Sequence, residues 1–299
     1  MIWIPAKLGA KTVEHAGLVV EVQLNGVKNS VLMQLDTGCD ADLVYDIPFD
    51  QLGLDLTRVG QNQVSLGGTV AGRPFERERF YVRKTAGASF LSLFLLSLAE
   101  RIAIWRGKPI LLGTIGAVFL EQRVLLLDFV AHRVAILGEG EELPGTIAAR
   151  TEFTPIEYRD SKIFVAVAIN GVKYRDLAFD TGSSPVAVVT TERHWLEWTG
   201  RQPDDPDNSV MVAWSWDRYG KWLGAPMKGA LCVSTACLAS PLAFFESTGL
   251  PTSDFDRYPF RISGLIGNAL FDERSTVIVD IPHRRFGLFA GSLANPAPR

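Results

Sequence analysis

The sequence predicts an all-β chain made of two copies of one folding unit, with few and short helices. Two pairs of similar segments indicate the duplication: residues 19–38 resemble residues 165–182, and residues 110–128 resemble residues 264–280. Short apolar runs separated by turn residues indicate strands throughout. The chain has 299 residues, of which 47% are hydrophobic and 21% charged, enough for a sizeable core. Length alone permits two domains or one large one, and the repeats favour two.

The first pair of segments predicts a hairpin in each half. Alternating apolar residues lead to Asn25-Gly26 in the first half and to Asn170-Gly171 in the second. Asn-Gly between such runs favours a tight turn, because both residues tolerate positive φ. The strand that follows ends in Asp-Thr-Gly in both halves, and Asp180 lies 144 residues after Asp36.

The second pair predicts a buried strand in each half. An unbroken apolar run ends at Asp128 in the first half and at Asp280 in the second. Such runs are typical of strands buried on both faces. The His-Arg dipeptides that follow favour hairpin turns. We place the join in the Gly- and Glu-rich stretch 138–150, which predicts an N-terminal lobe 1–143 and a C-terminal lobe 144–299.

The predicted helices are short. One covers Thr190 to Trp198, and another starts at Ser240-Pro241 and stops at Gly249. The most apolar run, Ala88 to Ala99, is shorter than the roughly 20 residues that a membrane span needs. We expect a buried helix there, with a surface anchor as the alternative, and no membrane span.

Charge, cysteine and histidine patterns exclude several classes. The net charge of −3 offers no excess of positive charge for a phosphate backbone, so nucleic acid is not expected as a partner. The histidines stand at no metal-ligand spacing, so no metal or cofactor is expected. Cys232 and Cys237 could pair with each other, but we expect free thiols because the chain starts without a secretory signal. A cytoplasmic location follows, with a periplasmic or secreted one as the alternative if the chain is processed.

Two Asp-Thr-Gly triplets carry the chemistry. One triplet alone would indicate only a turn. Two copies, each after an apolar strand and each before an apolar-apolar-Gly segment, resemble the two-lobed pepsin-like aspartic proteases, with retropepsin-like features in each lobe. The resemblance covers nearly the whole chain as architecture. The matching motifs are Asp36-Thr37-Gly38, Leu111-Leu112-Gly113, Asp180-Thr181-Gly182-Ser183 and Leu265-Ile266-Gly267.

The resemblance implies a catalytic pair, Asp36 and Asp180, one from each lobe. Two adjacent carboxyls cannot both ionise cheaply, so they share a proton. The ionised member can then activate a water while the protonated member polarises the peptide carbonyl. The residues expected to support the pair are Thr37, Gly38, Cys39, Thr181, Gly182 and Ser183. The expected protein is a monomeric aspartic endopeptidase that binds an extended peptide or protein substrate.

The chain departs from the family pattern beside the first aspartate. Ser183 offers a hydroxyl to Asp180, whereas its counterpart Cys39 is a poorer donor. Asp40 and Asp42 are expected to be solvated turn residues that add negative charge. These features predict an activity optimum that is less acidic than that of stomach-type enzymes.

The substrate-binding elements are less specific. A glycine-rich stretch with Gly67 and Gly68 is the candidate flap, but it lacks the tyrosine of the family and could be an ordinary turn. Trp214 and Trp216 share one face of a strand and could line a wall for apolar side chains, or pack elsewhere. The alternative function is a catalytically weak or inactive peptide- or protein-binding member of the same fold. A two-carboxylate glycosidase is the least supported reading.

Overall fold

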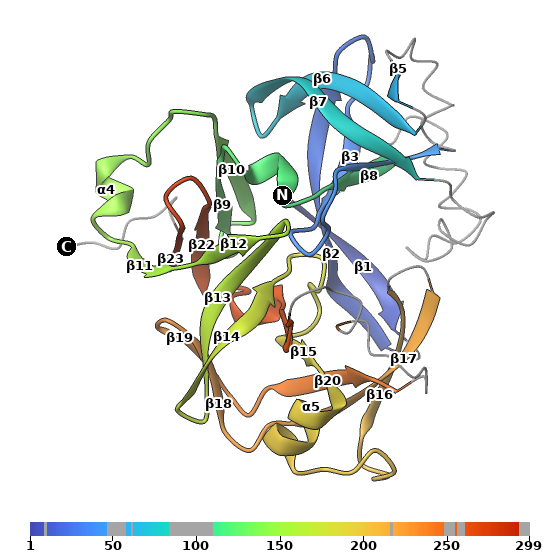
Figure 1. Ribbon diagram of the computed structural model, residues 1–299, viewed down its shortest axis with the longest axis vertical. Coiled ribbons are helices and arrows are strands. Elements are labelled where there is room, and N and C mark those ends of the chain that lie inside the picture. The colour runs from blue at the N-terminus through green and yellow to red at the C-terminus, as the bar shows by residue number, and fades with distance from the viewer. Residues whose placement is uncertain are drawn as a thin grey trace.

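The computed structural model describes residues 1–8, 11–46, 58–60, 62–83, 110–215, 218–247, 255 and 261–292. It is mostly β and two-lobed, which confirms the predicted all-β, pepsin-like fold class (Figure 1). The predicted lobe boundary at residues 143 and 144 stays a prediction. The apolar run 88–99 and Trp216 lie outside the described residues.

The N-terminal part of the chain forms an eight-stranded sheet in the order β1-β2-β3-β8-β4-β7-β6-β5. The strands are β1 Ile2–Leu8, β2 Lys11–Leu24, β3 Val31–Leu35, β4 Leu43–Tyr45, β5 Arg58–Gly60, β6 Gln63–Val70, β7 Arg73–Arg83 and β8 Leu111–Ile115. β3 alternates buried and half-buried residues, as the period of two in its sequence predicts. β3 pairs in parallel with β8 and ends directly before Asp36.

The C-terminal part forms a ten-stranded sheet in the order β16-β17-β20-β15-β21-β14-β13-β18-β19, with β12 also paired to β13. The strands are β12 Glu157–Arg159, β13 Lys162–Ile169, β14 Val172–Phe179, β15 Val188–Thr190, β16 Ser209–Ser215, β17 Arg218–Pro226, β18 Ala230–Val233, β19 Ala236–Ala239, β20 Leu242–Glu246 and β21 Gly264–Ile266. β14 pairs in parallel with β21 and ends directly before Asp180, so the second half repeats the arrangement of the first.

A five-stranded sheet joins the two halves in the order β10-β9-β22-β23-β11. Its strands are β9 Val124–Asp128, β10 Arg133–Leu137, β11 Glu152–Pro155, β22 Ser275–Asp280 and β23 Arg285–Ala290. Every residue of β9 and β22 is buried, which confirms the prediction for the two apolar runs. Because β9 pairs with β22, strands from the two halves of the chain share one sheet, where green and red ribbons meet in Figure 1.

Three of the four predicted turns form as the sequence indicates. Asn170 and Gly171 both have positive φ and connect β13 to β14 directly. His132 and Arg284 also have positive φ, in the turns after β9 and β22. The Asn25-Gly26 pair lies in a longer connection, since Val22 is the partner of Val31.

The predicted helices give one success and one error. Helix α5, Glu192–Thr199, forms with Thr191 as its N-cap. The helix predicted over residues 240–249 is wrong, because Leu242–Glu246 is strand β20. β20 lies between β15 and β17, and this sheet pairing overrides the Ser-Pro helix-start signal. The other regular helices described are α4, Gly145–Ala148, and the 3₁₀ turns η1, Val118–Leu120, and η3, Asn268–Leu270.

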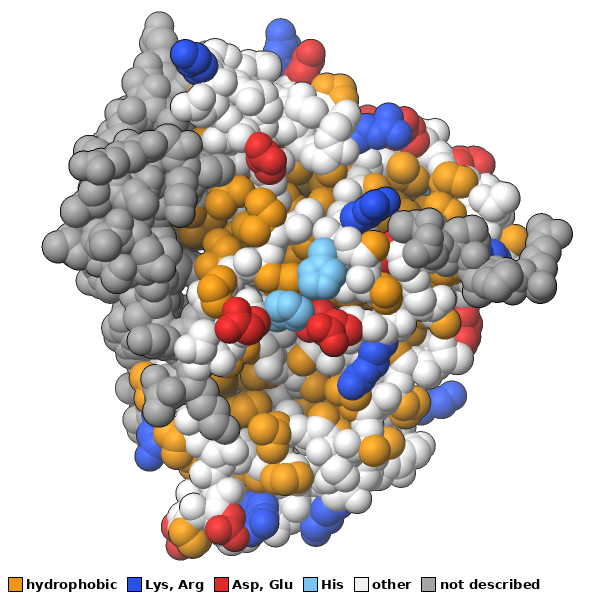
Figure 2. All heavy atoms as spheres, turned by 180° about the vertical axis from the view of Figure 1, so that it is seen from behind, with side chains coloured by type: hydrophobic (Ala, Val, Ile, Leu, Met, Phe, Trp, Pro, Cys, Tyr) orange, Lys and Arg blue, Asp and Glu red, His pale blue; other side chains and the backbone are white. Residues whose placement is uncertain are grey.

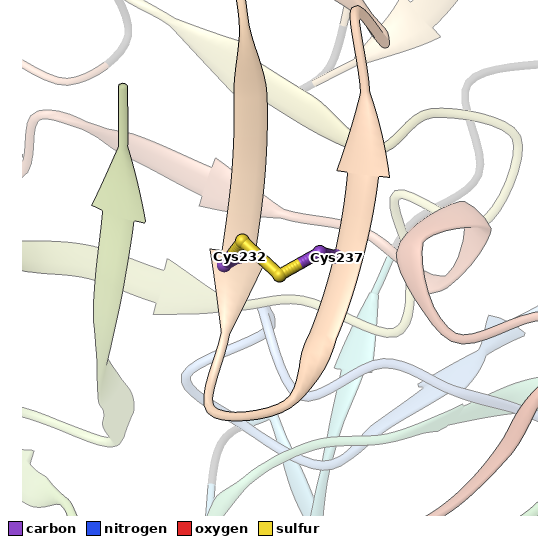
Figure 3. The surroundings of a disulfide bond; sticks show 2 residues. All are labelled: Cys232 and Cys237. Atoms are coloured by element: carbon purple, nitrogen blue, oxygen red, sulfur yellow. A yellow bond between two sulfur atoms is a disulfide. The ribbon is translucent and has the colours of Figure 1, made fainter. Parts of the chain in front are cut away.

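Cys232 and Cys237 form a disulfide, so the expectation of free thiols is wrong (Figure 3). The two residues are direct partners on the adjacent strands β18 and β19, with their Cα atoms 4.1 Å apart. This register brings the side chains within bonding reach, and the spacing in sequence does not reveal it. Cys39 is free.

A side-chain contact joins His15 on β2 to Asp272 in the C-terminal part of the chain. The His15 ring stacks on Trp3 and lies edge-on to His132, with ring centres 4.6 Å and 5.5 Å apart. Its Nδ1 contacts the Asp272 carboxylate at 2.5 Å. Figure 2, which views the molecule from behind Figure 1, shows two adjacent histidine side chains beside acidic groups. Within the described residues, none of the helices is long and apolar enough to cross a membrane.

Candidate active site

The two Asp-Thr-Gly loops are held in place by the strands behind them. The amide of Asp36 donates to the carbonyl of Ile115 at 3.0 Å, and the amide of Asp180 donates to Ile266 at 2.9 Å. Ile115 and Ile266 end β8 and β21, the strands that carry the apolar residues of the two apolar-apolar-Gly segments. Each aspartate therefore starts its loop from a fixed point at the end of a buried parallel strand pair.

The glycines of the apolar-apolar-Gly segments allow the chain to cross closely behind each loop. A Cβ on Gly113 would lie 2.0 Å from the Leu43 carbonyl oxygen, and one on Gly267 would lie 2.1 Å from that of Ser183. Contacts this short exclude any side chain at either position. The same close crossing occurs in both halves.

The two threonines interlock across the two halves. The amide of Thr37 donates to Thr181 Oγ1 at 2.9 Å, and the amide of Thr181 donates to Thr37 Oγ1 at 3.0 Å. Each hydroxyl then donates to a carbonyl of the opposite half, that of Phe179 or Leu35. All these bonds are buried, so they fix the two loops against each other with no competition from water.

This interlock brings Asp36 and Asp180 together. Their carboxyl groups lie close enough to interact directly, so the pair can hold one proton between them. Gly38 faces the opposite carboxyl, and a Cβ there would lie 2.4 Å from the Asp180 carboxyl group. Gly182 faces Asp36 in the same way, at 2.5 Å. The sequence prediction that one carboxyl from each half meets the other is realised in this geometry.

Burial and the neighbouring carboxyl raise the pKa of Asp36 well above its usual range. The largest cause is burial, and the second is the negative charge of Asp180. The Gly38 amide and the positive charge of Lys162 oppose this rise. The pair therefore retains a proton at a pH where an isolated aspartate is ionised.

The donors to the two carboxyls differ. Each accepts a backbone amide from its own loop, from Gly38 at 3.0 Å or from Gly182 at 2.8 Å. Ser183 adds a hydroxyl donor to Asp180 Oδ2 at 2.6 Å, as predicted. Cys39 makes no matching bond, because its thiol donates to the Ala41 carbonyl at 3.1 Å.

The Cys39 thiol stays protonated at ordinary pH. Burial, followed by the negative charge of Asp36, raises the pKa of Cys39 to about 12. It is therefore neither a reactive thiolate nor a donor to the carboxyl pair.

Lys162 reaches this site although sequence reasoning did not select it. It is the first residue of β13, its side chain is buried, and its Nζ donates to the Gly38 carbonyl at 2.7 Å. The available signal was a lysine at the start of an otherwise apolar buried strand. That signal does not reveal where the amine points.

Asp42 is not the solvated turn residue that the sequence predicts. It is buried, and its carboxyl accepts the Gly116 amide at 2.7 Å. Burial raises the pKa of Asp42 to about 7, while the Gly116 bond opposes the rise. Asp40 is exposed, as expected.

The predicted substrate-binding residues are placed as follows. Gly67 lies against the Asn25 side chain, and Gly68 lies against the backbone of Gln23, where β6 pairs with β2. Both glycines therefore serve a close strand crossing, and their role in a flap stays a prediction. The backbone of Trp214 lies in β16, and its proposed wall also stays a prediction.

The described residues contain no group of three or more histidine, cysteine or acidic side chains placed to hold a metal ion.

Comparisons with known proteins give fold-level similarity and no relative by sequence. No family model matches the chain, and no curated protein matches it. Among solved structures, basic 7S globulin from soybean is similar over 94% of this chain and 98% of its own, with 11% identity and a TM-score of 0.43. Conglutin gamma, a basic 7S globulin from lupine seeds, is similar over 93% and 95%, with 12% identity and a TM-score of 0.43.

These findings correct the family assignment. The expected membership of the pepsin-like aspartic proteases is wrong, since no family model matches the chain and both structures are named as basic 7S globulins. At a TM-score of 0.43 these two structures carry no argument about the activity of this chain.

Proposed function

We propose that this chain binds extended peptides across Asp36 and Asp180, and that the pair hydrolyses a peptide bond as a catalytically weak member of its fold. One observation carries the proposal: two carboxyls from opposite halves face each other, each packed against the glycine of the other loop, and the pKa of Asp36 is raised. A structural salt bridge or a turn would have no need for that arrangement. The interlocked threonines hold it in register.

The shared proton allows hydrolysis by general acid–base catalysis. The ionised carboxyl takes a proton from a water whose oxygen attacks the peptide carbonyl carbon. The protonated carboxyl donates its proton to the carbonyl oxygen, which forms a neutral tetrahedral species. Collapse of this species breaks the C–N bond, and a proton is delivered to the leaving amine. The titration belongs to the pair, so neither Asp36 nor Asp180 is assigned one role alone.

The missing donor at Cys39 supports a weak activity. A hydrogen bond to a charged group contributes roughly 1.5–3 kcal/mol. Ser183 supplies such a bond to Asp180, whereas the Cys39 thiol is committed to the Ala41 carbonyl. Asp36 therefore accepts one hydroxyl hydrogen bond fewer than Asp180 does.

The proposed partner is an extended peptide or protein segment bound by strand-like backbone hydrogen bonds. We propose that the chain acts as a monomer, because both carboxyls come from one chain. The Cys232–Cys237 disulfide favours an oxidising compartment. Of the two predicted locations we therefore propose the periplasmic or secreted one.

The test combines peptide cleavage with peptide binding. The full chain is incubated with a mixed library of internally quenched peptides from about pH 3 to about pH 7, and cleavage products are identified by mass spectrometry. We expect slow cleavage that is inhibited by a pepstatin-like statine peptide. Asp36→Asn and Asp180→Asn should each abolish cleavage while folding and inhibitor-peptide binding persist. Asp40→Asn is the matched control, since Asp40 is exposed in the same loop.

Cleavage that survives both Asn variants would refute the proposed catalytic pair. Specific peptide binding without cleavage in the native chain would refute the hydrolytic part. That outcome would establish the second candidate, a binding protein without hydrolysis, which the orientation of Cys39 favours.

A further inference from the structure

Lys162 is a buried cation beside the carboxyl pair. Only 1% of its surface is exposed, and its Nζ donates across the junction of the two halves to the Gly38 carbonyl. Burying a charged amine costs several kcal/mol unless acceptors or negative charges compensate it. The Gly38 carbonyl accepts from this lysine, and the lysine also interacts electrostatically with Asp36, so both groups compensate its charge.

The arrangement has no counterpart in the other half. When the halves are aligned on their Asn-Gly turns, which lie 145 residues apart, Lys162 corresponds to Gly17. Glycine has no side chain that could reach the second Asp loop. The half that receives the lysine is the one whose loop carries Cys39, and the other half has the Ser183 hydroxyl.

We propose that Lys162 is a positioning residue that tethers the Asp36 loop and supplies the positive charge that replaces the hydroxyl donor missing at Cys39. The inference rests on the proposed function, since it treats the carboxyl pair as catalytic. The effect that it describes is a change in the ionisation of that pair. Each carboxyl then has one donor or charge beyond its backbone amide. Asp180 has the serine hydroxyl within its loop, and Asp36 has the ammonium contributed by the opposite half.

Other titratable groups facing Asp36 cannot supply this charge. Within the described residues these are Asp180 from the opposite half, the Cys39 thiol in the same loop, and the Tyr45 phenol on β4. Burial raises the pKa of Cys39 to about 12 and that of Tyr45 further still, so both remain neutral across the acidic range. Lys162 therefore provides the positive charge that favours ionisation of the pair.

The test is an NMR titration of the intact chain labelled with ¹³C at the aspartate carboxyls. The pair is identified by the signals that change in Asp180→Asn. Lys162→Met should raise the midpoint of the first ionisation of the pair by about one pH unit, a tenfold change in the proton equilibrium. Lys173→Met removes the same charge from an exposed position on β14 and should leave the midpoint unchanged.

Two further variants keep the test decisive. Lys162→Gln can still donate to the Gly38 carbonyl, so it should fold even if Lys162→Met does not, and its midpoint should rise as well. Adding Cys39→Ser to either variant should bring the midpoint back toward the wild-type value, because a serine hydroxyl can donate to Asp36.

A midpoint within about 0.3 pH units of the wild type in folded Lys162→Gln would overturn the inference. If the midpoint is raised but Cys39→Ser does not lower it, the inference that Lys162 replaces the hydroxyl donor missing at Cys39 would be overturned. The titration needs neither peptide nor turnover. If the chain hydrolyses no peptide, a raised midpoint in the Lys162 variants would therefore still support this inference. If the chain hydrolyses peptides but the midpoint does not rise, only this inference is refuted.

Discussion

Replacing Asp42 by asparagine should stabilise the protein at neutral pH. The carboxyl is 3% exposed and accepts the Gly116 amide at 2.7 Å, a bond that an asparagine Oδ1 can also accept. Burial raises the pKa of Asp42 from 3.8 to about 7. The folded protein therefore binds a proton between these pH values that the unfolded chain releases.

The sign and size follow from this difference. Below about pH 4 both states are protonated, and Asp42 costs nothing relative to asparagine. As the pH rises from about 4 to about 7, the unfolded chain ionises while the folded chain does not, so folding becomes less favourable. Above the folded pKa the cost is constant. Three pH units at about 1.4 kcal/mol each give an upper limit of roughly 4 kcal/mol.

The assay is thermal or urea unfolding of wild type and Asp42→Asn from about pH 4 to about pH 8. We expect equal stability at the acidic end and an advantage of about 2–4 kcal/mol for the variant near neutral pH. For a chain of this size that corresponds to a Tm higher by roughly 5 °C. Contributions from Asp36 are common to both proteins and cancel in the difference. An advantage that is independent of pH, or a variant that is less stable at neutral pH, would refute the reasoning.

Three other changes test the remaining features. Cys39→Ser should increase peptide cleavage by about tenfold or more and move the acidic limb of the pH–rate profile to lower pH, because a hydroxyl can stabilise ionised Asp36. An unchanged profile would show that a hydroxyl donor at position 39 is irrelevant. Thr37→Val should lower the unfolding free energy by roughly 2–4 kcal/mol and abolish cleavage, because it leaves the Thr181 amide buried without its acceptor. Thr37→Ser retains the hydroxyl and should remain near wild type in both measurements. Equal losses in the two variants would contradict the role of the hydrogen bond. The double variant Cys232→Ser/Cys237→Ser should cost about 2 kcal/mol of stability, as expected for so short a loop, and leave cleavage unchanged. A loss of cleavage at wild-type stability would mean that the β18–β19 hairpin acts on the carboxyl pair.

The duplicated features of the fold and of the site were predictable from sequence. A pattern that occurs twice at matched spacing is readable without coordinates, and the Asp-Thr-Gly loops, the crossing glycines and the buried strands β9 and β22 all belong to that class. Each copy confirms the other, so chance matches are excluded. The strand β20 was missed because its residues satisfy local helix signals, whereas its pairing partners come from distant parts of the chain.

Several features that occur in one half only were not predictable, for a physical reason. The burial of Asp42 and the direction of Lys162 depend on contacts across tens of residues, and neither has an equivalent in the other half that could reveal it. The Cys232–Cys237 bond depends on the register of β18 and β19 in the same way. These unpaired features matter for function because a symmetric carboxyl pair would ionise without preference. Cys39 and Lys162 make the surroundings of Asp36 unlike those of Asp180, and that difference determines the pH range over which the pair shares its proton.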